Sequence, residues 1–300
     1  MNIWTVTLRQ EITAISRERL PRGLLAVFLG MTAASAVIGS SAKATVGDVY
    51  REVAAQGLTT ARNPFDGLPA LYYARNNVIY IILIGALLAI ITGVQSTTRD
   101  RRARTADLVL SRNISPATYL GAKLAGLAAL FAVLLLAAAI LTFAGIAIVT
   151  GALPTPDESL RLVGLYALAW LFLMPFLVLG MLSGLHTSST TTALLAPIVL
   201  WSIVIFILPL AGTAALPVSL LNPVPAPAAA PTGFFAVTSG FTGPLAVGEQ
   251  FKHAAATILQ DQSAAGSVTA PVLILAAVLV AVCVVLLATN RQRIRSELHA

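Results

Sequence analysis

Ionisable residues and cysteine are both scarce in this sequence. Asp, Glu, Lys and Arg make up 10% of its 300 residues and hydrophobic residues 57%, whereas soluble domains usually carry about 25% charged residues. The single cysteine, Cys283, excludes an internal disulfide and any metal site built from cysteines. So little charge among so much apolar sequence predicts a membrane protein.

Two further absences bear on the energy source. No phosphate loop of the form Gly-x-x-x-x-Gly-Lys-[Ser/Thr] occurs, so we predict that the chain is no enzyme by itself and cannot bind ATP through that motif. No Asp, Glu, Lys or Arg lies near the middle of a long apolar run. Carriers driven by ion gradients usually place ionisable groups there. We expect no cofactor and no metal to bind this chain.

Apolar runs long enough to cross a bilayer recur along the sequence. They predict an all-α polytopic membrane protein with six transmembrane helices, at about residues 24–41, 76–95, 117–149, 160–182, 191–211 and 270–290. Residues 1–21 predict an amphipathic interfacial helix, and residues 22–300 a single transmembrane domain. A secretory signal ending near residue 44 is the less favoured alternative for the first span, because the segment before it is long and partly acidic.

The basic residues fall at span ends, which predicts the topology. They are dense in the N-terminal segment, between the second and third spans, and in the C-terminal tail. Positive-inside loops therefore place both termini in the cytoplasm of a multi-pass protein of the plasma (inner) membrane. The outer loops are then residues 42–75 and 212–269, the second with an amphipathic helix near Val247–Gln260. The same distribution accounts for the net charge of +7 without nucleic-acid binding.

The densest basic cluster lies in a cytoplasmic coupling region, residues 96–116, between the second and third spans. It consists of Arg99, Arg101, Arg102, Arg104 and Arg112. Ser115 can cap the next helix and Pro116 falls at its first position, where a missing N–H costs nothing. We therefore predict a folded basic elbow on the cytoplasmic side.

This stretch resembles the cytoplasmic loop of type-2 ABC transporter permeases, the six-span exporters whose ATPase is a separate subunit. The matching residues are Asp100, Thr105, Leu108-Val109-Leu110, Ser111 and Lys123, whereas Arg104, Ala106 and Asn113 depart from the family pattern. The hairpin from Leu182 to Trp201 is similar to that of permeases akin to the one that serves nitrous oxide reductase maturation.

The resemblance implies a permease subunit that couples ATP hydrolysis by a separate cytosolic ATPase to transport, as an exporter. Implied partners are two ATPase subunits, which would hold ATP and Mg, and a second permease copy or a paralogous permease within the lipid bilayer. An outer accessory protein is a further candidate. The implied ATPase-coupling residues are Asp100, Arg101, Arg102, Arg104, Thr105, Leu108, Ser111 and Arg112, with Ser115, Pro116 and Lys123 at the start of the next span.

Other interpretations stay open at this point. The arginines serve as topology anchors in any case. Gly180-x-x-x-Gly184 has the spacing of close helix packing, although in an alanine-rich sequence we favour chance. An ATP-independent carrier would need a buried charge, and a membrane assembly factor would act through the outer loops.

Overall fold

The computed structural model describes residues 13–14, 18–59, 69–102, 115–212, 221–226, 232–261 and 266–288. Within these ranges all regular structure is helical, as the composition predicts. The principal elements are α2 (Arg19–Ala55), η1 (Ala70–Ala74), α3 (Asn76–Tyr80), η2 (Ile81–Gly85), α4 (Ala86–Arg102), α6 (Pro116–Thr150), α7 (Pro156–His186), α8 (Thr190–Ser202), η3 (Ile203–Ile207), α9 (Leu208–Gly212), α10 (Phe234–Thr242), α11 (Val247–Ile258) and α12 (Thr269–Leu287).

Five helical segments among the described residues are long and apolar enough to cross a membrane. They are Ala70–Arg99, Pro116–Thr150, Pro156–His186, Thr190–Gly212 and Thr269–Leu287. Each contains or closely matches one of the second to sixth predicted spans. The first predicted span, residues 24–41, lies within α2, which is not one of the five.

Helix α2 is longer than the sequence analysis predicts. Residues 42–55, predicted to begin an outer loop, continue the same helix to Ala55. The reason is local: no proline interrupts the segment, and the helix ends only before Gly57, whose φ of 71° is left-handed. At the other end Glu18 is extended and α2 begins at Arg19, so Arg19–Pro21 belong to this helix rather than to a separate interfacial one.

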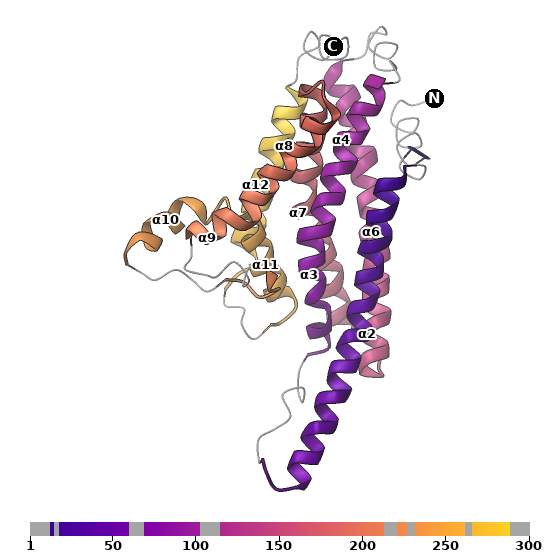
Figure 1. The fold of residues 1–300 in the computed structure, drawn as a ribbon, viewed down its shortest axis with the longest axis vertical. Helices are drawn as coiled ribbons and strands as arrows, with labels where there is room; N and C mark the ends of the chain where they lie inside the picture. The colour runs from indigo at the N-terminus through magenta and orange to yellow at the C-terminus, as the bar shows by residue number, and fades with distance from the viewer. Residues whose placement is uncertain are drawn as a thin grey trace.

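The core of the bundle is the contact between α4 and α7 (Figure 1). The buried side chains of these two helices include Ile90 and Val94 from α4 and Phe172, Leu173 and Leu177 from α7. Helices α2 and α6 pack together on one flank, and α8 and α12 lie on the other (Figure 1). The flanking helices leave large apolar side chains exposed, which is the surface that a bilayer covers.

The described residues of the predicted second outer loop form two helices, and one of them packs deeply. The predicted amphipathic helix near residues 247–260 corresponds to α11. Phe251 of α11 stacks on Phe172 with ring centroids 4.6 Å apart, and the two rings lie near the middle of α7. Helix α10 packs against α9 and projects to the side of the bundle (Figure 1).

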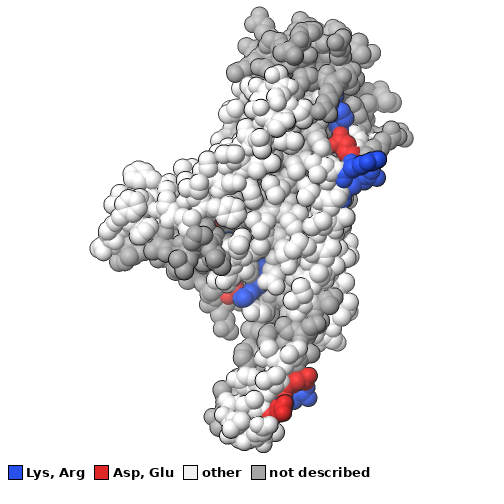
Figure 2. Space-filling model, viewed as in Figure 1, with Lys and Arg blue, Asp and Glu red and all other residues white. Residues whose placement is uncertain are grey.

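On the face that Figure 2 shows, charged side chains occupy only a few places among the described residues. In this view they gather toward the two ends of the long axis, with one small group between, and the rest of the described face is uncharged. Ion pairs between charged residues of the described chain include Glu18–Arg99, Asp48–Arg51 and Arg75–Asp261. The long uncharged surface fits a protein embedded in hydrocarbon.

Candidate functional site

The elbow begins at the last turns of α4, where three other parts of the chain converge. We call residues 96–99, Ser96 to Arg99, the elbow root. Ser96, Thr97 and Thr98 are buried, and the hydroxyl groups of Thr97 and Thr98 donate to the carbonyl oxygen of Val94 at 3.1 and 2.9 Å. Such local bonds let hydroxyl groups lie inside a membrane helix without a distant partner. The elbow root is therefore a packed part of the bundle.

Lys123 ties the elbow root to α6. Its Nζ donates to the carbonyl oxygen of Ser96 at 2.8 Å, and only 1% of the residue is exposed. The ammonium group also lies 5.6 Å from the centroid of the Tyr119 ring. A bond from a charged donor is stronger than a neutral one, more so where water is absent. This contact joins the second and third predicted spans just where the elbow leaves one and enters the other.

Arg99 ties the elbow root to the start of α2. Its Nη1 lies 3.1 Å from Oε1 of Glu18, and both side chains are about one quarter exposed (24% and 26%). Glu18 is the residue that precedes α2, so the ion pair joins the beginning of one helix to the end of another. The ion pair therefore connects the residue before α2 to the elbow root.

Helix α7 meets the same part of α4 through glycines. A Cβ atom on Gly180 would overlap the carbonyl oxygen of Ile90, and one on Gly93 would overlap that of Leu177. The two backbones are therefore in direct contact, which only glycine permits. One turn farther, Gly184 lies against the hydroxyl group of Thr97 in the elbow root. The structure thus places both glycines of the Gly180–Gly184 motif against α4 of the same chain.

The elbow enters α6 through a well-formed helix start. Ser115 is the N-cap, its Oγ accepts from the backbone N–H of Thr118 at 3.1 Å, and Pro116 is the first residue of the helix. Asp100, Arg101 and Arg102 form the end of α4, but their side chains lie outside the described part of the structure. The remaining predicted coupling residues, Arg104, Thr105, Leu108, Ser111 and Arg112, lie outside the described residues altogether.

A second polar group lies at the far end of the bundle, and the sequence analysis did not single it out. The hydroxyl groups of Thr142 and Tyr166 are 2.6 Å apart, and Asn77 Nδ2 donates to Thr142 Oγ1 at 2.9 Å and to the Tyr166 hydroxyl at 3.3 Å. The three residues come from α6, α7 and α3 and are buried. Single polar residues at the edges of three apolar runs give no signal that they meet.

Helix α11 carries a buried ion pair that the search for charges within spans could not reveal. Lys252 Nζ lies 2.8 Å from Glu249 Oε1, and the exposed fractions of the residues are 3% and 8%. The other carboxylate oxygen of Glu249 accepts from the backbone N–H of Ala226 at 2.8 Å. The i, i+3 spacing of opposite charges was the available signal, but the segment looked like part of a loop. Among the described residues no cluster of His, Cys, Asp and Glu could hold a metal ion.

Together these features define a class of protein. It is a polytopic helical membrane protein in which α2, α6 and α7 all contact the end of α4 at the elbow root. Comparison with protein families makes the assignment specific. The model of the ABC-2 family transporter proteins matches residues 8–291, nearly the whole chain, and the protein belongs to this family. It is therefore the membrane permease component of an ABC transporter and works with an ABC ATPase. A comparison with curated proteins gives no match.

Proposed function

We propose that this chain is the permease subunit of an ABC exporter, and that a separate cytosolic ATPase drives it through the elbow. The complex would contain two ATPase subunits, which hold ATP and Mg, and a second permease copy or a paralogue. In this proposal six spans cross the plasma (inner) membrane, the first within α2, and both termini lie in the cytoplasm.

The observation that carries the proposal is the convergence of contacts on the elbow root. Lys123 bonds Ser96, Arg99 pairs with Glu18, and Gly184 abuts Thr97, so α6, the start of α2 and α7 all meet the end of α4. A force applied to the elbow would then move these helices together rather than bend one of them. Packed elements move as rigid bodies because close-packed interfaces do not deform continuously.

The test is co-purification of the permease with its cognate ABC ATPase. Changing Arg101→Glu together with Arg102→Glu should abolish the complex, because two repulsive charges replace two attractive ones at the elbow, while the permease stays in the membrane. The matched control reverses two charges away from the elbow, Arg51→Glu with Arg161→Glu, and should leave the complex intact. An unchanged complex in the elbow variant contradicts the docking site.

A second candidate function gains one specific observation. An ATP-independent carrier needs an ionisable group at membrane depth, and the buried Glu249–Lys252 pair beside the middle of α7 is such a group. Both carboxylate oxygens of Glu249 are already bonded, which favours a structural pair. Solute movement in vesicles that hold the permease alone, lost in Glu249→Gln, would favour the carrier over the ABC exporter.

A further inference from the structure

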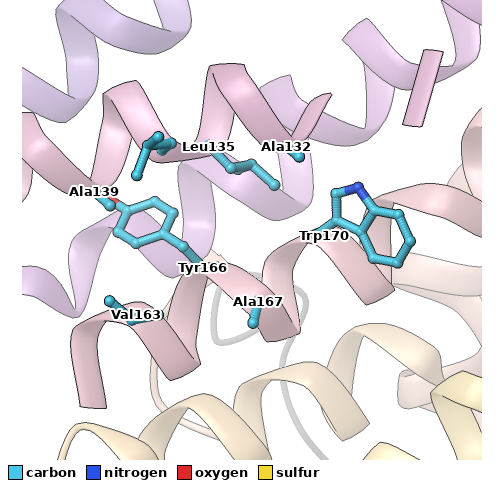
Figure 3. Close-up of a pocket in the computed structure, with 8 residues that line it drawn as sticks. Ala132, Leu135, Ala139, Val163, Tyr166, Ala167 and Trp170 are labelled. Carbon is cyan, nitrogen blue, oxygen red and sulfur yellow. The ribbon is translucent and has the colours of Figure 1, made fainter. Parts of the chain in front are cut away.

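An apolar groove of 340 Å³ runs between α6 and α7 (Figure 3). Three alanines, Ala132, Ala139 and Ala167, leave room along it, and the larger side chains of Leu136, Val163 and Trp170 border it. The volume is at the lower end of the range for ligand pockets, about 300 to 1,000 Å³. The groove therefore suits one slender ligand.

The depth of the groove can be counted along both helices. Its lining begins 16 residues from Pro116 on α6, and 16 residues from His186 on α7, and in each case it ends at 23 residues. At a rise of about 1.5 Å per residue it lies roughly 24 to 35 Å from the elbow end. Measured from buried Lys123, the distance is about 14 to 24 Å. In a hydrocarbon core about 30 Å thick, this is the leaflet away from the elbow.

The surroundings of the groove face hydrocarbon. Val133, Ile140 and Val163 beside or along it are 66%, 61% and 60% exposed. The polar atoms of its aromatic lining are bonded inside the protein: Trp170 Nε1 donates to the Ala128 carbonyl oxygen at 2.9 Å, and the Tyr166 hydroxyl contacts Thr142 at 2.6 Å. The groove thus offers an apolar wall, continuous with the lipid-facing surface, and an occupant needs no polar group.

We propose that this groove is a binding site for one acyl chain of a phospholipid in the leaflet away from the elbow. Hydrocarbon chains are the molecules present at that depth, and a chain that fills the hollow restores the dispersion contacts that the alanines leave unmade. The lipid is a resident ligand rather than cargo, so the site does not depend on the ATPase proposal. It makes the α6–α7 interface sensitive to the acyl chains of the membrane.

Fluorescence of Trp170 can test the site, because bromine on an acyl chain quenches an indole that it touches. Lipid-stripped permease in detergent is titrated with a phosphatidylcholine brominated in mid-chain, and Trp170→Phe isolates the signal of this residue. Ala167→Leu, on α7, fills the groove. Ala144→Leu adds the same bulk at an exposed position of α6 that does not line the groove. We expect quenching that saturates near one lipid per chain, persists in Ala144→Leu, and weakens at least several-fold in Ala167→Leu.

Three results would overturn the proposal. Quenching that rises without saturation, or that is equal in the two leucine variants, means ordinary lipid solvation of the surface. A bound species that leaves only when the ATPase and ATP are supplied is transported cargo instead. Native mass spectrometry provides the second measurement, since one phospholipid should remain on the wild type and on Ala144→Leu but not on Ala167→Leu.

Discussion

Gly180 acts through the side chain that it lacks. The α4 backbone at Ile90 fills the space that a Cβ atom would need, and Gly93 makes the reciprocal contact with Leu177. In a membrane no hydrophobic force drives helices together, so their association depends on this kind of close packing. These two glycines therefore set the distance between the two most buried helices.

Gly180→Ala should consequently destabilise the bundle. The added methyl group meets backbone atoms that cannot turn away, and overpacking of this kind costs about 1–3 kcal/mol. Thermal unfolding of the permease in detergent measures the effect. Gly164→Ala is the control on the same helix, because nothing lies within 4 Å of the new Cβ and the alanine favours the helix. Equal melting temperatures for the two variants would refute the packing argument.

We expect Lys123 to position the elbow root through its bond to the Ser96 carbonyl oxygen. Lys123→Met keeps most of the apolar stem but removes the charged donor to Ser96, a loss of about 1.5–3 kcal/mol for a bond of this type. We expect the complex with the ATPase to form and the transport per ATP hydrolysed to fall several-fold. Transport and ATPase assays on the same vesicles give that ratio.

Arg161→Met provides the comparison for Lys123. It breaks only the partly exposed pair with Asp157 at the far end of α7, where such pairs contribute about 0.3–0.5 kcal/mol. The ratio of transport to hydrolysis should stay at the wild-type value. If Lys123→Met also keeps that ratio, the Lys123–Ser96 bond does not transmit the movement of the elbow.

At the scale of elements, α11 is held in place by groups that the rest of the bundle buries. Phe251 stacks on Phe172, and Glu249 accepts from the Ala226 N–H while it pairs with Lys252 of the same helix. The amphipathic pattern predicts this helix well, because its apolar face repeats at helical spacing. That face does not reveal the surface it packs on, so the sequence places α11 in an outer loop and the structure places it against α7 and α12.

The buried pair makes a specific prediction for α11. Lys252→Met alone should cost about 3–5 kcal/mol, because it leaves the Glu249 carboxylate buried and uncompensated. Glu249→Gln combined with Lys252→Met should recover most of that loss, since the amide keeps an oxygen for the Ala226 N–H. Unfolding of the single and double variants in detergent gives the coupling between the two residues. Losses that simply add would show that the two side chains act independently.

For the molecule as a whole, the sequence predicts the elements better than their contacts. The helix start at Ser115–Pro116 follows from local chemistry and is present. Helix α7 begins at Pro156, before the predicted span 160–182, because Thr155 and Glu158 form a capping box that the sequence analysis did not identify. The close contact of α4 with α7 does not follow, because small residues at helical spacing fit several partners. The hydrogen-bonded group of Asn77, Thr142 and Tyr166 also does not follow from the sequence. Each residue alone gives no signal of a partner, and only the fold brings the three together.

The candidate site shows the same division. The dense arginines and the residues from Asp100 to Lys123 that resemble the family's loop predict the elbow from sequence, and the family match supports the class of protein. The anchoring of the elbow depends on Ser96 and Glu18, a backbone carbonyl and a residue 81 positions away from Arg99. Every residue has a backbone carbonyl, so the sequence cannot indicate that the one of Ser96 accepts from Lys123. The contacts that anchor the elbow are therefore known only from the structure.

Helix α2 extends past the other helices at the end away from the elbow (Figure 1). It has 37 residues, or about 55 Å at the α-helical rise, and is fastened near its first residue by the Glu18–Arg99 pair. If α2 crosses the bilayer as proposed, a tilt of about 5° about that contact would move its far end by roughly 5 Å.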